Sequence, residues 1–226
     1  PLVVDQEGGG EYMELDLTAR RNLELTETLR GKEKKGSLLW VLDKTRTAMG
    51  HRLIRAWLEQ PLKSPVAIAA RQEAVAALVD DTVAREEISL SLRSVPDLER
   101  LIGRVVYGSA NARDLKALGE GLGVLPELRE QVKNLPGRQL SALTAGLDDL
   151  PELRETIAAA ICDEPPFTIR EAGFIRDGYD EEVDRLRGIL HGGKGFIADI
   201  EAREKEKTGI KSLKVGYNKV FGYYIE

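Results

Sequence analysis

The sequence is poor in the residues that build cross-links and catalytic centres. Its 226 residues include one cysteine, Cys162, two histidines and only 5% aromatic residues. A single cysteine excludes an internal disulfide framework and fits a reducing compartment. No apolar run approaches the roughly 20 residues needed to cross a bilayer, and the first residues lack the basic flank and apolar stretch of a signal peptide. We therefore expect a cytoplasmic protein without a membrane-spanning segment.

Arrangements typical of catalysis or metal binding are also missing. His51 and His191 lie far apart and have no carboxylate or thiol at ligand spacing, so a zinc site is not expected. Residues 188–195 nearly match the phosphate-binding pattern G-x-x-x-x-G-K-[ST], but the last position is glycine and a helical pattern precedes it in place of a strand. We predict a glycine-weakened turn or kink in a helix there. The sequence predicts no catalytic residue, cofactor site or metal ligand.

The net charge of −5 is distributed unevenly. From residue 207 onward, Lys207, Lys211, Lys214 and Lys219 stand against Glu226 alone, so this tail carries +3 and the remaining residues carry −8. A basic tip on an acidic body suits local contact with phosphates better than extended binding. A solvated charged surface without a partner is the other interpretation.

Most of the chain has the periodicity of amphipathic helices. Ser37 can cap a short helix, and Thr47 can cap the next one. In that second helix, Met49, Leu53 and Trp57 follow the spacing of a buried stripe. Further helices are predicted at 66–79, 82–95, 96–106, 112–125, 127–134, 138–145 and 151–161, and from about 179 to 207. No alternation of strands and helices predicts a parallel sheet.

Two residue types inside these helices need an explanation. Trp40 and Trp57 could offer a platform for stacking bases, but both lie on apolar helical stripes, which favours core packing. Gly50 weakens its helix, and this suggests a close approach by another backbone.

Two segments break the helical pattern. Residues 167–179, "FTIREAGFIRDGY", alternate on either side of Glu171–Gly173 and predict a small hairpin. Residues 213–226 are rich in β-formers and predict two antiparallel strands that turn at Asn218–Lys219. Because two strands are marginally stable alone, we expect the chain to be a fragment of a longer protein. The predicted fold class is mainly α, a multi-helix domain with a small β-hairpin and a truncated antiparallel β stub at the C-terminus.

Five blocks of sequence carry a resemblance to a known family. They are "LDLTARRNLEL", "GSLLWVLDKTRTAMGHRLIRAWLEQPL", "VPDLERLIGRV", "EPPFTIREAGFIRDGYDEEVDRLR" and "TGIKSLKVGYNKVFGYYIE". Together, and in this order, they resemble the MutS family of bacterial DNA mismatch-repair proteins. The resemblance covers nearly the whole chain from about Tyr12.

The resemblance implies a division into three segments. Residues 12–208 would form the helical core or lever domain, which in this family links the ATPase end of the molecule to the DNA clamp. Residues 209–226 would begin the clamp domain, truncated here, and residues 1–11 would be a linker or a remnant of the connector. The clamp meets the DNA backbone without reading sequence, so Lys211, Lys214 and Lys219 are the expected DNA-proximal residues.

The resemblance also implies activities that this chain lacks. The family reads mismatches with a Phe-x-Glu motif, and none of Phe167, Phe174, Phe196 and Phe221 is followed by Glu two residues later. We expect ATP and Mg to bind elsewhere in a parent DNA-dependent ATPase, which would act as a homodimer with a MutL-type partner. Binding of double-stranded DNA through the clamp would be weak or absent in this chain alone.

Two other interpretations stay open from the sequence. One is a MutS-like paralogue that acts in recombination and lacks a mismatch-reading domain. The other is a helical interaction scaffold without any nucleic-acid partner.

Overall fold

The computed structural model describes residues 10–220 and 222–226, with only the backbone of residues 191, 193, 194 and 196. Most of the predicted linker 1–11 and Phe221 therefore lie outside the described residues, as do the side chains of His191 and Phe196. The chain divides into two compact units, one ending at Phe174 and the other beginning at Ile175. The predicted domain boundary at 208/209 stays a prediction.

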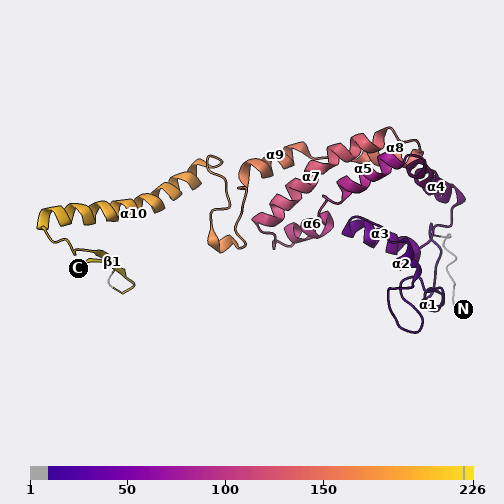
Figure 1. Cartoon of the computed structure of the whole chain (residues 1–226), viewed down its shortest axis with the longest axis horizontal. Helices are drawn as coiled ribbons and strands as arrows, with labels where there is room; N and C mark the ends of the chain where they lie inside the picture. Colours follow the sequence, from indigo (N-terminus) through magenta and orange to yellow (C-terminus); the bar gives the residue numbers. More distant parts are fainter. Residues whose placement is uncertain (1–9, 221) are drawn as a thin grey trace, which may run out of the picture. The chain divides into compact units, whose positions relative to one another are not determined.

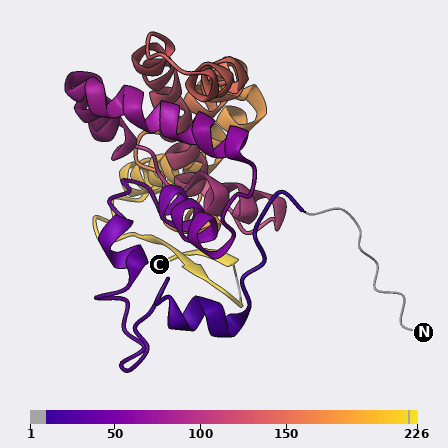
Figure 2. The ribbon, with the colours of Figure 1, turned by 90° about the vertical axis from the view of Figure 1, so that its right-hand side faces the viewer.

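The first unit is built from helices (Figure 1). In chain order they are α1 (Leu17–Asn22), α2 (Leu38–Leu42), α3 (Ala48–Glu59), α4 (Pro65–Asp80), α5 (Thr82–Leu92), α6 (Leu98–Val106), α7 (Ala112–Lys133), α8 (Arg138–Gly146), α9 (Pro151–Ala160) and the 3₁₀ helix η1 (Ile169–Glu171). The residues between α1 and α2 form a loop that projects away from the helices (Figures 1 and 2).

Side-chain caps set the starts of these helices. Ser37, Thr47 and Asn111 each accept a hydrogen bond from the backbone N–H three residues further on. Each cap satisfies an amide that has no partner inside its helix. The predictions for the starts of α2, α3 and α7 are confirmed.

Helix α7 runs through Pro126 as one element of 22 residues. The prediction of separate helices at 112–125 and 127–134 is therefore wrong. Proline removes one backbone hydrogen bond and usually ends or kinks a helix. Here Leu122 and Leu128, on either side of Pro126, are both buried, and α7 packs against α5, α6, α8 and α9. Packing along the whole helix offsets the missing bond.

The hydrophobic core lies where α4, α5, α7 and α8 meet. Its buried members are Ala74, Ala77, Leu135 and Leu140, and Leu78, Ala84, Ile88 and Val132 pack against them. The small residues of α4 let its neighbours approach closely.

Glycines on α7 permit two further close contacts. A Cβ atom on Gly121 would lie 2.7 Å from Cδ of Pro96 and 2.9 Å from Cδ2 of Leu98, and one on Gly119 would lie 3.0 Å from Cγ2 of Ile157. The segment that leads into α6 and one face of α9 therefore pack directly against the backbone of α7 at these two glycines. A larger side chain would push them away.

The predicted buried stripe of α3 is not buried. Leu53 is 52% exposed and Trp57 37%, and Trp40 on α2 is 46% exposed. The expectation of core packing for both tryptophans is therefore wrong. Helical spacing shows which side chains share a face, but not whether another element of the described residues covers that face. The guanidinium of Arg71 does lie 3.7 Å from the ring centroid of Trp57, a cation–π contact.

Gly50 has a local explanation. Its Cβ position is closest to Oγ1 of Thr47, at 3.1 Å, and to Cβ of Thr45, at 3.3 Å. The close approach comes from side chains of the preceding turn, so the predicted contact with another backbone is wrong.

The second unit consists of one long helix and a hairpin. Helix α10 (Glu181–Thr208) continues without interruption through residues 188–195, so of the predicted turn or kink the turn does not form. Strands β1 (Val215–Asn218) and β2 (Gly222–Ile225) pair antiparallel, with Val215 opposite Ile225 and Asn218 opposite Gly222. The long helix and the C-terminal pair of strands are both confirmed. No helix among the described residues is both long and apolar enough to cross a membrane.

The hairpin predicted at 167–179 does not form. Thr168 and Glu171 make a reciprocal capping box that closes η1, and Ala172 follows with a φ of 55°. The amide of Cys162 instead donates to the carbonyl of Phe174 at 3.0 Å. The local side-chain bonds of Thr168 and Glu171 therefore outweigh the alternation of the flanking residues.

Candidate nucleic-acid interface

The three predicted DNA-proximal lysines lie in and around the hairpin of the second unit. Lys211 lies in the turn after α10, Lys214 directly precedes β1, and Lys219 lies in the turn between β1 and β2. All three are exposed. A strand rises about 3.3 Å per residue, so Lys214 and Lys219 are roughly 16 Å apart along the hairpin. The structure thus places Lys211 and Lys214 near one end and Lys219 at the other.

The backbone around these lysines is held in several places. Gly209 ends α10 in the left-handed region, with a φ of 73°, and Leu213 is buried. The amide of Lys214 donates to the carbonyl of Glu226 at 2.7 Å, and the amide of Glu226 donates back at 2.9 Å. This pair extends the ladder of β1 and β2 by one step.

Glu201 ties the hairpin to α10. One carboxylate oxygen accepts from Nζ of Lys205 at 2.6 Å, and the other accepts from the amide of Val215 at 3.2 Å. The bond from Lys205 and then the bond from Val215 lower the pKa of Glu201, and the charge of Lys214 adds to this effect. Lys214 is therefore partly balanced by a nearby acid. Lys211 and Lys219 have no ion pair among the residues that the structure describes.

The arrangement can provide charge without a binding pocket. Exposed ammonium groups spread along a hairpin suit contacts with phosphates, which position a nucleic acid but do not read its sequence. Tyr217 and Tyr223, which pack edge to face with ring centroids 5.0 Å apart, are exposed on the same hairpin.

Two ion-pair networks in the first unit were not predicted from the sequence. Asp43 accepts hydrogen bonds from Oγ1 of Thr45 at 2.7 Å and from Nζ of Lys34 at 3.1 Å, and it lies 2.6 Å from Nδ1 of His51. These partners, Thr45 first, hold the pKa of Asp43 well below its usual range. The side chain of His51 is 38% exposed and pairs with Asp43.

Arg52 forms the second network. Its guanidinium binds Asp97 through two bonds of 2.7 and 2.9 Å, and it binds Glu99 at 2.6 and 2.8 Å. The bonds to Asp97 and then Glu99 raise the pKa of Arg52, and Arg52 in turn lowers that of Asp97. The network joins α3 to the start of α6 across 45 residues of sequence. Spacing alone offers no signal for such a pair.

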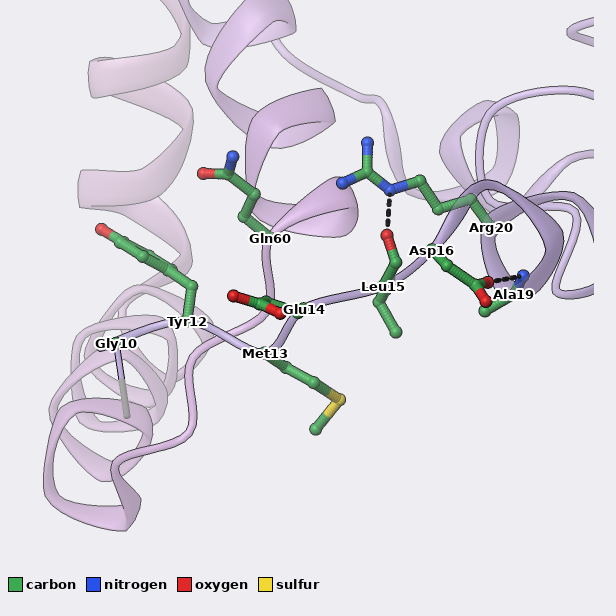
Figure 3. Close-up of a pocket in the computed structure, with 9 residues that line it drawn as sticks. All are labelled: Gly10, Tyr12, Met13, Glu14, Leu15, Asp16, Ala19, Arg20 and Gln60. Atoms are coloured by element: carbon green, nitrogen blue, oxygen red, sulfur yellow. Dashed lines mark hydrogen bonds between the residues drawn. The ribbon is translucent and has the colours of Figure 1, made fainter. Parts of the chain in front are cut away.

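Three hollows lie among the described residues of the first unit, and one of them, of about 330 Å³, is lined mainly by charged side chains of α7 and of residues 163–165. One of about 730 Å³ lies between the extended segment 10–16 and Gln60, where Tyr12 and Met13 point to opposite sides and Arg20 donates to the carbonyl of Leu15 (Figure 3). Another, of about 320 Å³, is lined mainly by aliphatic side chains of α4, α5, α7 and α8.

Two site types considered from the sequence, a metal centre and a phosphate-binding loop, can be compared with the described residues. No group of three or more His, Cys, Asp or Glu side chains among them has the geometry to hold a metal ion. The stretch 188–195 lies inside α10, whereas a phosphate-binding loop precedes its helix. This stretch therefore does not have the geometry of a phosphate-binding loop.

Comparison with known proteins identifies the family. The sequence model of MutS domain III matches residues 18–214, most of the chain. The chain belongs to the MutS family. It is 53% identical over 216 residues to the DNA mismatch repair protein MutS of Symbiobacterium thermophilum, and 50% identical to the proteins of the same name from Alkaliphilus oremlandii and Acetivibrio thermocellus.

These matches cover 96% of this chain but only 24–25% of each relative. The chain thus spans about a quarter of the length of the curated MutS proteins it matches. The MutS domain III match includes Lys211 and Lys214 and ends one residue before β1, so Lys219 lies beyond it.

Proposed function

We propose that this chain is the core and lever region of a MutS-type DNA mismatch-repair protein. In this proposal, residues 12–208 couple the ATPase end of the parent protein to its DNA clamp, residues 209–226 begin the clamp, and residues 1–11 are a linker or a remnant of the connector. The match to MutS domain III over residues 18–214 carries the proposal.

The lengths and the packing of the helices support a transmitting role. At 1.5 Å per residue, the 28 residues of α10 are about 42 Å long and the 22 residues of α7 about 33 Å. Close contacts such as Gly121 against Pro96 resist gradual deformation. A lever also needs two global states, each favoured by a different ligand. In this proposal the two ligands are nucleotide at one end and DNA at the other.

The proposed partners follow from the same assignment. Lys211, Lys214 and Lys219 would contact phosphates of double-stranded DNA. ATP and Mg would bind the parent DNA-dependent ATPase outside this chain, and the parent would act in the bacterial cytoplasm as a homodimer with a MutL-type partner. The relatives named for mismatch repair favour this role over a recombination paralogue or a scaffold without a nucleic-acid partner.

A chimaera tests the lever role. In it, this chain replaces the matching quarter of the Symbiobacterium thermophilum protein, and mismatch repair is measured in cells lacking their own MutS. We expect repair with the native sequence and with Gly192→Ala, because alanine favours a helix. We expect Gly192→Pro to abolish repair, because proline interrupts α10. Full repair with Gly192→Pro would contradict a transmitting role for this helix.

A titration tests the DNA contact. Fluorescence anisotropy would follow this chain with matched and G·T-mismatched duplexes at low and physiological salt. We expect weak binding that has the same affinity for both duplexes and disappears at physiological salt. Replacing Lys211, Lys214 and Lys219 by Gln should lower this affinity further. A preference for the mismatch would contradict our placing of recognition outside this chain.

A further inference from the structure

A second cluster of positive charge lies far from the hairpin in sequence. Residues 30–46 contain six Lys or Arg against two acids, a net charge of +4 in a chain of net charge −5. The six cations are Arg30, Lys32, Lys34, Lys35, Lys44 and Arg46, and all of them are exposed. We call them the basic loop surface. Its charge exceeds the +3 of residues 207–226.

The fold brings the two halves of this surface together. Nζ of Lys34 lies 3.1 Å from Oδ2 of Asp43, which places the loop between α1 and α2 against the segment after α2. Ser37 is fully buried, and both its amide and its hydroxyl donate to the carbonyl of Lys34. The amide of Thr28 donates to the carbonyl of Glu33 at 2.9 Å and closes the loop. The four cations of the loop between α1 and α2 therefore lie on a hydrogen-bonded backbone that projects from the helices (Figures 1 and 2).

Most of this charge is not neutralised. Of the six cations, only Lys34 has an ion pair within the described ranges 10–220 and 222–226. Arg46 donates from Nε to Oγ of Ser89 at 2.8 Å, which orients its guanidinium without cancelling its charge. Asp43, the acid at the centre, is already engaged by Thr45, Lys34 and His51. Residues 30–46 therefore keep most of their net charge of +4, next in sequence to Glu24 and Glu27.

The composition of the loop indicates the kind of partner. No apolar side chain lies between Arg30 and Gly36, so this part of the surface lacks the apolar anchors that insert into membranes or fill the centre of protein interfaces, whereas Trp40, Val41 and Leu42 are exposed in the helix that joins it to Lys44. Contacts with a phosphate backbone need only cations and hydrogen-bond donors. We propose that the basic loop surface binds the phosphate backbone of double-stranded DNA, as a second contact beyond Lys211, Lys214 and Lys219. The choice of DNA among polyanions rests on the proposed role in DNA repair.

Three sets of substitutions in this chain test the proposal. The loop variant carries Lys32→Gln, Lys35→Gln and Lys44→Gln. The hairpin variant carries the three changes already described. The control variant removes three other exposed cations that have no ion pair in the part of the chain described, with Lys63→Gln, Arg93→Gln and Arg138→Gln.

Each variant would be titrated with one matched duplex across a salt series, after circular dichroism has verified its helix content. We expect the loop variant to bind about tenfold more weakly at low salt than the control variant. Its slope of log affinity against log salt should be shallower by up to about 2.7, since each lost phosphate contact removes about 0.9.

The outcomes separate this inference from the proposed hairpin contact. Weaker binding by the loop variant alone would support the inference and contradict the proposed contact at the hairpin. Weaker binding by both variants would support two separate contacts with DNA. A loop variant that matches the control in affinity and slope would overturn the inference, whatever the hairpin variant does. In that case an acidic protein surface would be the better partner for the loop. Absence of binding by the unmodified chain at low salt would overturn both contacts.

Discussion

Asp43 shows how a single carboxylate organises the turn between α2 and α3. It engages Thr45, Lys34 and His51, which come from both sides of α2 in sequence. Its side chain is mostly buried, at 13% exposure. Removing a charged acceptor with several donors leaves those donors without a partner, which costs more than the mean hydrogen bond.

We therefore expect Asp43→Asn to lower the free energy of unfolding at pH 7 by about 1–3 kcal/mol. The folded-state pKa of Asp43 is lowered, so its stabilisation is fully present above the unfolded pKa of about 4 and disappears as pH falls toward the folded value. Urea unfolding followed by circular dichroism at pH 7 and pH 3 measures the difference, which should shrink at pH 3. Asp80→Asn, at an exposed aspartate, is the control. A difference independent of pH would contradict the ionic role of Asp43.

Gly121 makes a second prediction at this scale. Alanine there would place Cβ 2.7 Å from the rigid ring of Pro96, and we expect a loss of about 1–3 kcal/mol from overpacking. Gly123→Ala, on the same helix with only Cδ of Arg154 at 3.9 Å, should be neutral or stabilise by up to about 1 kcal/mol. Thermal unfolding of both variants decides the matter. Equal effects would show that helix propensity outweighs the contact with Pro96.

At the scale of elements, the connection between α10 and the hairpin depends on few groups. Leu213 is buried, and Glu201 binds the first amide of β1. A sheet of two strands is marginal without such support. The position of the proposed DNA-contacting lysines therefore depends on the helix beside them.

We expect Glu201→Ala to speed hydrogen exchange at the amide of Val215, because that amide loses its acceptor. Glu206→Ala, at an exposed glutamate on the same helix, should leave the exchange of Val215 unchanged. Exchange read by NMR is the measurement. Equal rates in the native chain and in Glu201→Ala would show that other contacts hold the hairpin.

At the scale of the whole molecule, the two units differ in how many hydrophobic side chains they bury: the first has a packed core and the second has few buried side chains. The buried cluster of α4, α5, α7 and α8 belongs to the first unit. In the described residues of the second unit, Leu213 is the only buried hydrophobic side chain. Stability should follow this difference, because burial of apolar surface dominates folding.

We expect residues 10–174 to unfold cooperatively as a separate polypeptide, with a midpoint near that of the whole chain. Residues 175–226 alone should show a broad, non-cooperative loss of helix, because α10 would have little to pack against. Thermal scans by circular dichroism of both polypeptides test this. A sharp transition in residues 175–226 would show that this unit has a core of its own.

The sequence by itself determined the features that depend on near neighbours. Ser37, Thr47 and Asn111 cap helices through amides three residues away, and residues 213–226 form their hairpin through a short turn. The same local blocks carried the family resemblance and led to Lys211, Lys214 and Lys219, whose contact with DNA stays a prediction.

Only the tertiary structure decided what depends on residues far apart in the chain. Helical spacing placed Leu53 and Trp57 on one face, yet both are exposed because no described element covers that face. Pro126 reads as a break, yet α7 continues through it because packing on both sides outweighs one missing hydrogen bond. In the sequence, residues 30–36 form a charged loop without a visible partner. In the structure, the contact between Lys34 and Asp43 brings this loop close to the segment that carries Lys44 and Arg46. Both the burial of a side chain and the clustering of charges depend on contacts between segments that lie far apart in the sequence, so neither follows from local spacing.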